Sequence, residues 1–278
     1  MYPIHSYFKN KTVVITGGSG ILCSEMARAL SKQQANIVII NRTLEKGEKI
    51  ADELRSLGGQ SMALSVDILD KDSLLDARTQ ILDKFGAIHV LINGAGGNHP
   101  DAITFDEYFI ENSKGNTFFD LDETGFKQVF NTNFLGTFLA TQVFAEELLK
   151  VDQSSILNIS SMSGYSPLTK VPAYSAAKSS INNFTQWLAV YFAGTSIRVN
   201  SIAPGFFLTD QNRALLTNED GSHTDRAEKI LSQTPLKEFG QPDDLIGAML
   251  FLTDPHYSRF ITGIIIPVDG GFLAYSGV

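Results

Sequence analysis

The sequence has very little cysteine, no long apolar run and no excess of positive charge, and each shortage excludes a class of protein. Cys23 is the single cysteine among 278 residues, which rules out an intramolecular disulfide and a cysteine-only zinc cage and fits a reducing compartment. No apolar stretch approaches the length that crosses a bilayer, and residues 1–8 lack the charged and apolar regions of a secretory signal. We therefore expect a cytoplasmic protein with no membrane partner.

Basic residues are fewer than acidic ones, 22 against 30, so the formal net charge is −8 at pH 7. Such a chain has no general attraction for phosphate backbones, and we expect no nucleic-acid partner. The five histidines show no metal-ligand spacing such as His-Glu-x-x-His, so we expect no metal. With 43% hydrophobic residues, the chain can bury a substantial core.

Apolar runs rich in β-branched residues alternate with longer segments of helical spacing. The helical segments lie near residues 20–34, 43–57, 71–85 and 122–150, and each is long enough to cross back over a sheet. Runs that are apolar throughout indicate strands buried on both faces, as in parallel sheets. We predict an α/β fold, a Rossmann-type doubly wound sheet of seven mainly parallel strands with helices on both faces. The predicted strands are 12–16, 37–40, 62–66, 88–92, 155–159, 197–202 and 263–267.

No repeat, low-complexity tract or linker divides the chain, so we expect residues 1–278 to form one domain. Two segments interrupt the alternation: an insert at 97–121, rich in Asn, Asp and Phe, and a polar segment at 206–225. Both follow predicted strands and should lie above the carboxyl edge of the sheet, where open α/β folds bind ligands. We interpret the second segment as a lid, and expect both to surround a ligand site.

The first predicted strand continues into a glycine-rich turn, Thr16-Gly-Gly-Ser-Gly-Ile-Leu-Cys23, which opens into a helical pattern. Glycines allow a tight turn and the close approach of main-chain N–H groups to a pyrophosphate, and the helix N-terminus adds a favourable dipole. Because Cys23 replaces the last glycine of G-x-G-x-x-G, this motif alone is also compatible with a plain strand-to-helix turn.

The second predicted strand ends in Asn41-Arg42, where an NAD-binding fold usually carries a carboxylate for the ribose 2′-hydroxyl. Without that carboxylate, Arg42 can pair with a 2′-phosphate through charge-assisted contacts. We therefore predict that NADP(H) is preferred. The alternative is a solvated Arg42 and an Asn41 that bonds a ribose hydroxyl, which leaves NAD(H) acceptable.

Ser161, Tyr174 and Lys178 form a candidate catalytic set. The spacing of four places Tyr174 and Lys178 on one face of a helix. A phenol with a pKa of about 10 is a poor proton donor near neutral pH, but an ammonium about 5 Å away lowers that pKa by about two units at an effective dielectric of about 20. We therefore expect a lowered pKa for Tyr174, and we expect Ser161 to stabilise charge on a carbonyl oxygen rather than attack it.

Taken in order, these motifs resemble the short-chain dehydrogenase/reductase family, and the match spans nearly the whole chain. Further elements that resemble the family are Asp67, its adenine-contacting acid; Asn93-Gly-Ala-Gly96; Asn133, its catalytic Asn; Pro204-Gly205 with Thr209; and the closing Asp269-Gly-Gly271. The resemblance implies hydride transfer between a nicotinamide and an alcohol or carbonyl, with Asn133, Ser161, Tyr174 and Lys178 as the catalytic residues.

The resemblance also implies a cofactor-binding set. One departure affects it, because Ile21 and Cys23 stand at the last two glycine positions of the family's turn. Cysteine is small enough for close packing of helix against strand, so we expect the turn to survive with shifted phosphate contacts. The implied residues are Gly17, Ser19, Gly20, Ile21, Leu22, Asn41, Arg42, Asp67, Ile68, Asn93, Ala95, Gly96, Tyr174, Lys178, Pro204, Gly205, Phe207 and Thr209.

A narrower resemblance concerns the substrate. The turn and the stretch Asn93-Gly-Ala-Gly-Gly-Asn-His-Pro-Asp101 with the insert that follows are similar to the branch assigned as D-mannonate oxidoreductases, or fructuronate reductases. This implies D-fructuronate, D-mannonate or a related sugar acid as the small-molecule substrate. The candidate polar contacts are Asn98, His99, Lys114, Ser163, Lys170 and Arg213, and the apolar candidates are Phe118, Phe119, Phe206 and Phe207.

Two alternatives stay open. The aromatic loops also suit a 3-oxoacyl thioester or another ketone, and a chain of this fold could bind a nucleotide without turnover. The family resemblance further implies a homotetramer, because similar family members pair their fourth and fifth helices across subunits. We expect Phe138, Phe144, Trp187 and Phe192 to be exposed on those helices.

Overall fold

The computed structural model describes residues 5–209 and 213–277 of the chain. Its seven strands all pair in parallel, in the order β3-β2-β1-β4-β5-β6-β7, which confirms the predicted doubly wound sheet. The central strands are buried along their whole length, as their continuous apolar runs indicate. The strands are β1 Thr12–Thr16, β2 Asn36–Asn41, β3 Ser61–Ser65, β4 Val90–Asn93, β5 Ser154–Ile159, β6 Ile197–Pro204 and β7 Ile265–Val268.

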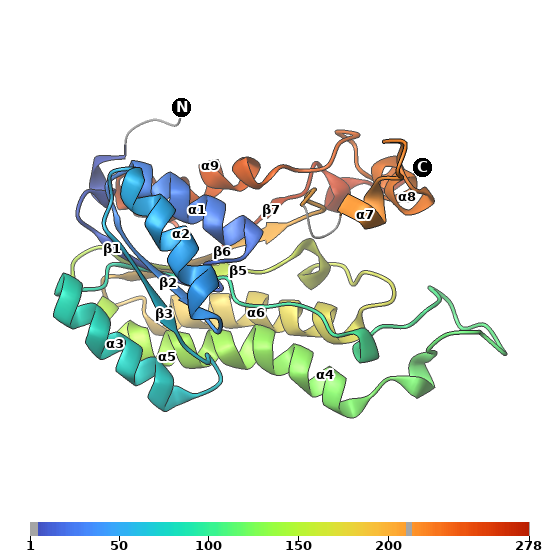
Figure 1. The fold of residues 1–278 in the computed structure, drawn as a ribbon, viewed down its shortest axis with the longest axis horizontal. Coiled ribbons are helices and arrows are strands. Elements are labelled where there is room, and N and C mark those ends of the chain that lie inside the picture. The colour runs from blue at the N-terminus through green and yellow to red at the C-terminus, as the bar shows by residue number, and fades with distance from the viewer. Residues whose placement is uncertain (1–4, 210–212, 278) are drawn as a thin grey trace.

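Helices cover both faces of the sheet, and each face has its own core (Figure 1). One core joins the sheet to α1, α2 and α9, for example through Met26, Leu54 and Met249, and the other joins it to α3, α5 and α6. The helices are α1 Ile21–Lys32, α2 Leu44–Ser56, α3 Lys71–Phe85, α4 Glu123–Phe130, α5 Gly136–Leu148, α6 Pro172–Tyr191, α7 Arg213–Leu216, α8 Asp225–Gln233, α9 Ile246–Thr253 and α10 Pro255–Ser258.

The helical segment predicted over 122–150 is interrupted by a π-helical turn, Asn131–Leu135, between α4 and α5. The Nδ2 atom of Asn133 donates to the carbonyl of Val129, four residues earlier, at 2.8 Å. A side chain that takes this carbonyl competes with the main-chain N–H that an α-helix would place there. The turn therefore has a local cause, and it turns one polar side chain towards the carboxyl edge of the sheet.

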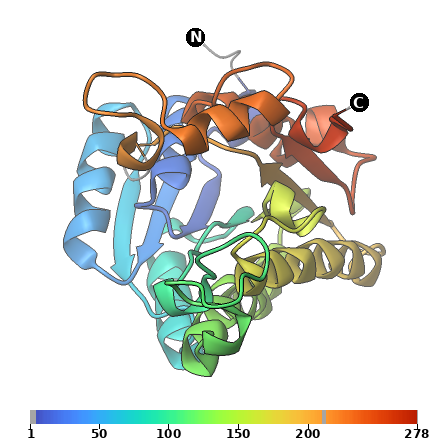
Figure 2. The ribbon, with the colours of Figure 1, turned by 90° about the vertical axis from the view of Figure 1, so that its right-hand side faces the viewer.

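The insert and the lid lie at the same end of the sheet, beyond the strands that precede them (Figures 1 and 2). The main-chain N–H of Thr104 in the insert donates to the carbonyl of Lys170 at 2.9 Å, which fixes the insert beside the segment before α6. The predicted lid, 206–225, contains α7 and the start of α8, and its residues 210–212 lie outside the described residues. In the described part of the chain, no helix is long and apolar enough to cross a membrane.

Candidate active site

The three candidate catalytic side chains meet beyond the end of β5. Ser161 caps a short 3₁₀ turn, Met162–Gly164, and its Oγ accepts a hydrogen bond from the N–H of Ser163 at 3.2 Å. Tyr174 lies in the first turn of α6, which begins with Pro172, a residue suited to a helix start. A side-chain hydrogen bond joins Ser161 to Tyr174. The Nζ atom of Lys178 lies 5.5 Å from the centroid of the Tyr174 ring.

The pKa of Tyr174 differs from the sequence-based expectation. Burial raises the pKa of this phenol above its ordinary value, and the hydrogen bond with Ser161 offsets only part of that increase. Lys178 is itself buried, which lowers the pKa of its ammonium to about 8, and its Nζ donates to the carbonyl of Ile159 at 2.8 Å. The expected lowering of the Tyr174 pKa is therefore wrong here, because burial disfavours the charged forms of both residues.

Asn133 lies close to this set, on the π-helical turn. Its amide is held on two sides by the main chain of the insert, donating to the carbonyl of Gly97 at 2.7 Å and accepting from the N–H of Gly97 at 3.3 Å. A Cβ atom added to Gly96 would lie 2.4 Å from the Oδ1 of Asn133 and 3.5 Å from the Nζ of Lys178. The two side chains therefore converge on one side of Gly96.

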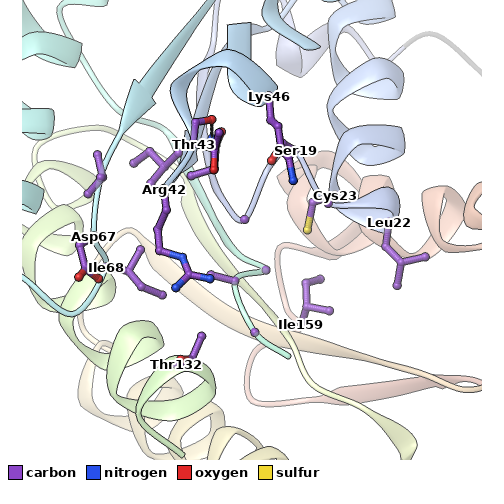
Figure 3. Close-up of a pocket in the computed structure, with 18 of the residues that line it drawn as sticks. Ser19, Leu22, Cys23, Arg42, Thr43, Lys46, Asp67, Ile68, Thr132 and Ile159 are labelled. Carbon is purple, nitrogen blue, oxygen red and sulfur yellow. Dashed lines mark hydrogen bonds between the residues drawn. The ribbon is translucent and has the colours of Figure 1, made fainter. Parts of the chain in front are cut away.

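The turn between β1 and α1 forms one wall of a cavity of about 480 Å³ (Figure 3). Gly17 has φ +65°, and a Cβ atom there would lie 2.8 Å from the Cα of Ala95, so the turn requires glycine. Cys23 packs tightly under Gly94, which is consistent with its small size. Burial raises the pKa of the Cys23 thiol to about 12. The thiol is therefore neutral near pH 7.

A second wall of the cavity comes from the end of β2 and the start of α2. Arg42 and Lys46 both extend into the cavity there (Figure 3), and Asn41 lines it. The Oδ1 atom of Asn41 is buried without a hydrogen-bond partner. An unpaired buried acceptor, two cations and a glycine turn at a helix N-terminus fit a dinucleotide, whose phosphates need cations or N–H groups and whose ribose hydroxyls can donate.

Eleven of the predicted cofactor-binding residues line this cavity, and sequence reasoning missed several others. Lys46 lies in the first turn of α2, whereas Arg42 precedes that helix, so no helical spacing joined the two cations in the sequence. The lining residues that were predicted are Gly17, Ser19, Gly20, Ile21, Leu22, Asn41, Arg42, Asp67, Ile68, Ala95 and Gly96; among those missed are Thr43, Lys46, Gln128, Thr132 and Ile159.

Other predicted cofactor residues lie outside the lining of this cavity. The Asn93 side chain is buried in the fold, where its Nδ2 donates to Thr141 and to the Oδ1 of Asn158, both at 2.9 Å. The Phe207 ring is buried in the core and packs against Gly240. Pro204 ends β6, Gly205 follows it and lies against Asp269, and Thr209 comes four residues after Gly205. Their roles in cofactor binding stay predictions.

The predicted substrate residues are distributed around the insert, the Tyr174 region and the lid. Ser163 is buried and its Oγ has no hydrogen-bond partner, whereas Lys170 and Arg213 are exposed. Asn98 and His99 bond to nearby main chain, Oδ1 of Asn98 to the N–H of His99 and Nδ1 of His99 to that of Asp101. Phe118 and Phe119 are 70% and 79% exposed, and Phe118 borders a cavity of about 140 Å³ within the insert; their place in a substrate pocket stays a prediction.

Comparison with known proteins places the fold and the site in a wider context. A family model described as short chain dehydrogenase matches residues 11–220. The chain is 59% identical to the uncharacterized oxidoreductase UxuB of Bacillus subtilis, over the full length of both. It is 50% identical to a candidate D-mannonate oxidoreductase from Haemophilus influenzae solved with bound NAD, with a TM-score of 0.94 and 97% of each chain covered. It is also 29% identical to the 7α-hydroxysteroid dehydrogenase of Escherichia coli, covering 94% of this chain and 93% of that protein.

Proposed function

This chain belongs to the short-chain dehydrogenase family, whose members oxidise alcohols or reduce ketones with a nicotinamide dinucleotide, and from that premise we propose that it interconverts D-fructuronate and D-mannonate. The observation that carries a catalytic role is the meeting of Ser161, Tyr174 and Lys178 beside the dinucleotide-sized cavity. The same side chains argue against a nucleotide-binding protein without turnover, because binding alone has no need of a phenol hydrogen-bonded to a serine.

The proposed chemistry divides between cofactor and protein. When bound, the reduced dinucleotide supplies a hydride to the carbonyl carbon. Tyr174 then gives its hydroxyl proton to the carbonyl oxygen, so that the ketone becomes a secondary alcohol. Ser161 donates to the developing oxyanion and holds it beside the phenol. Lys178 keeps a positive charge near the phenolate, and Asn133 fixes the main chain of Gly97 at the entrance to this region.

The choice of cofactor follows from the charges at the end of β2. Arg42 and Lys46 bring two cations to the cavity beside the end of β2, and the lining carboxylate, Asp67, comes from the segment after β3, so we propose that NADP(H) is preferred and that NAD(H), which is bound in the Haemophilus influenzae relative, is also accepted. In the test, kcat/KM for NADPH and for NADH is measured in the wild type and in Arg42→Ala with Lys46→Ala. The double variant should lower the NADPH value by about 10- to 1000-fold and leave the NADH value nearly unchanged.

The matched control for the cofactor test is Lys49→Ala. Lys49 is an exposed cation on the same helix but does not line the cavity. Its loss changes the net charge of α2 without removing a cation from the cavity wall. A wild-type enzyme that prefers NADH by more than tenfold contradicts the proposed preference, as does a Lys49 variant that behaves like the double variant.

The sugar-acid assignment is supported by the named relative that is 50% identical over nearly the whole chain and by the polar insert beside Tyr174. The alternative is a 3-oxoacyl thioester or another neutral ketone; the steroid dehydrogenase relative favours the neutral ketone, but at only 29% identity. Initial rates should be measured with D-fructuronate, an acetoacetyl thioester and a 7-oxosteroid. A kcat/KM for the thioester or the steroid that exceeds the value for fructuronate would replace the assignment.

We also propose a homotetramer that uses the outer face of α5 and α6. Along α6, Phe184, Trp187 and Tyr191 stack with ring centroids 6.3 and 4.9 Å apart, and Trp187 and Tyr191 are 56% and 66% exposed. Phe138 is also partly exposed. Phe144 and Phe192 are buried, so their expected exposure was wrong; the aromatic face is narrower than predicted. The cytoplasmic location stays a prediction.

A further inference from the structure

An ion pair joins the insert to α8, the helix that follows the predicted lid. The Nζ atom of Lys229 on α8 lies 2.6 and 2.5 Å from the two carboxylate oxygens of Glu107 in the insert, although 122 residues separate them in the sequence. The Lys229 ammonium therefore contacts both oxygens of the Glu107 carboxylate. Figure 2 looks onto the end of the molecule where the insert, α8 and the segment before α6 lie.

A second lysine acts on the same carboxylate. Lys229 and, more weakly, Lys170 lower the pKa of Glu107, so both cations favour the ionised acid. Lys170 adopts φ +71°, and its carbonyl accepts the N–H of Thr104 at 2.9 Å, which ties the lysine to the base of the insert. Lys170 also stands only four residues before Tyr174 in the chain.

The base of the insert is in direct contact with the catalytic region. Ala102 is fully buried and packs with Val129 of α4 and Ala173 of α6, and Tyr174 packs against this cluster. The Glu107 carboxylate is therefore presented by a loop that is anchored beside the catalytic tyrosine and again at Lys170. Lys170 belongs to the segment before α6 and Lys229 to α8, and both of these segments border the insert at this end of the sheet.

We propose that Lys229 is a carboxylate subsite for the substrate, and that Glu107 occupies it until a substrate carboxylate takes its place. The proposal rests on the proposed function, since it requires an acidic substrate. A substrate carboxylate offers the same two oxygens that Glu107 now offers. Lys229 and Glu107 are 57% and 26% exposed, and a pair of this exposure is weak enough for a ligand to exchange with it.

The test compares an acid with its own neutral form. KM and kcat are measured for D-fructuronate and for its methyl ester with the wild type, Lys229→Met and Glu107→Gln. Lys229→Met should raise the KM of the acid by about tenfold or more, because a charge-assisted contact is lost. Glu107→Gln should lower the same KM by about two- to fivefold, because an exposed competing ion pair is removed. Neither variant should change the KM of the ester by more than about twofold.

The matched control is Lys127→Met, which breaks the exposed pair of Lys127 with Glu123 on α4. It should leave both substrates unaffected. If Lys229→Met and Glu107→Gln change the acid and the ester alike, the ion pair merely holds two loops together and the subsite is refuted. The same conclusion follows if Glu107→Gln raises the KM of the acid.

Failure of the subsite can be told apart from failure of the proposed function. If the wild type reduces neutral ketones but no sugar acid, the proposed function fails. In that case D-gluconate is tested as a competitive inhibitor of neutral-ketone reduction. Inhibition that Lys229→Met relieves supports the subsite, and an equal inhibition constant in both proteins refutes it.

Discussion

At the residue scale, the central question is which hydroxyl supplies the proton. Ser161 and Tyr174 share a hydrogen bond. The Oγ of Ser161 already accepts a hydrogen bond from the N–H of Ser163, so the hydroxyl proton of Ser161 points towards a different acceptor. We predict that Tyr174→Phe lowers kcat for ketone reduction by about 10²- to 10⁴-fold, the usual contribution of a general acid. The dissociation constant of the dinucleotide, measured by fluorescence titration, should stay within about twofold. Turnover that survives this substitution would transfer the acid role to another group.

The buried ammonium of Lys178 sets a pH limit on the same reaction. Burial lowers its pKa from 10.5 to about 8, so the ammonium is present below pH 8 and is lost above it. If the positive charge is needed beside Tyr174, kcat/KM for reduction should be flat below pH 8 and fall about tenfold per pH unit well above it. Lys178→Arg keeps its charge throughout, and should show lower activity without this decline. A wild-type profile that is flat to pH 10 contradicts the assignment.

Residue identities at the site could be predicted from the sequence, whereas their electrostatics could not. The spacing of four placed Tyr174 and Lys178 on one helix face, and Ser161 was expected beside them from its position after a predicted strand and from the family resemblance. The pKa of Tyr174 depends on how far the rest of the chain removes it from water, and the simple charge–charge argument omitted that cost. Lys46 was missed for a related reason, because its role depends on which way the first turn of α2 faces.

At the scale of elements, the π-helical turn and the β4 loop form one unit. Asn133 bonds the main chain of Gly97, and Gly96 lies against both Asn133 and Lys178. We predict that Gly96→Ala lowers kcat by about 10- to 100-fold, because displacement of catalytic groups by about 1 Å is costly. It should also reduce the free energy of unfolding by about 1–3 kcal/mol, measured in urea.

The neighbouring glycine provides the control for that prediction. A Cβ atom at Gly97 has no atom within 4 Å, and the main-chain bonds of Gly97 to Asn133 do not involve its hydrogens at Cα. Gly97→Ala should therefore keep both activity and stability close to wild type. Equal losses in the two variants would show that the loop needs flexibility rather than the close approach at Gly96.

The elements themselves were predicted unevenly, for physical reasons. Continuous apolar runs such as Thr12–Thr16 gave strands to within two residues at every end, because full burial leaves few alternatives. The interruption at Asn131–Leu135 was invisible, since nothing in the local pattern reveals that Asn133 bonds the carbonyl of Val129. The insert was located by its composition, but its contacts, such as Glu107 with Lys229, span 122 residues and depend on the assembled fold.

At the scale of the whole molecule, the two cores bury many of the apolar side chains, and the aromatic stack on α6 runs from Phe184, which packs against one core, out to the exposed Trp187 and Tyr191. Phe184, Trp187 and Tyr191 form a continuous apolar stripe beside a groove of about 300 Å³ between α5 and α6. Large exposed aromatic patches of this kind mark protein contacts, and an outward-facing tryptophan is typical of the centre of such a contact. Assembly of identical chains is the simplest way to cover the stripe, because each copy supplies the same surface.

The assembly prediction is tested by placing a charge in the stripe. Trp187→Glu should dissociate the oligomer, because an unpaired carboxylate would have to be buried at the interface. Light scattering at micromolar concentration should then give the mass of one chain, against a multiple of it for the wild type. Leu44→Glu, a similarly exposed apolar residue at the start of α2 on the opposite side of the sheet, should leave the mass unchanged (Figure 1). A wild type that is already monomeric, or a Trp187 variant with the wild-type mass, would show that copies of this chain do not pair through this stripe.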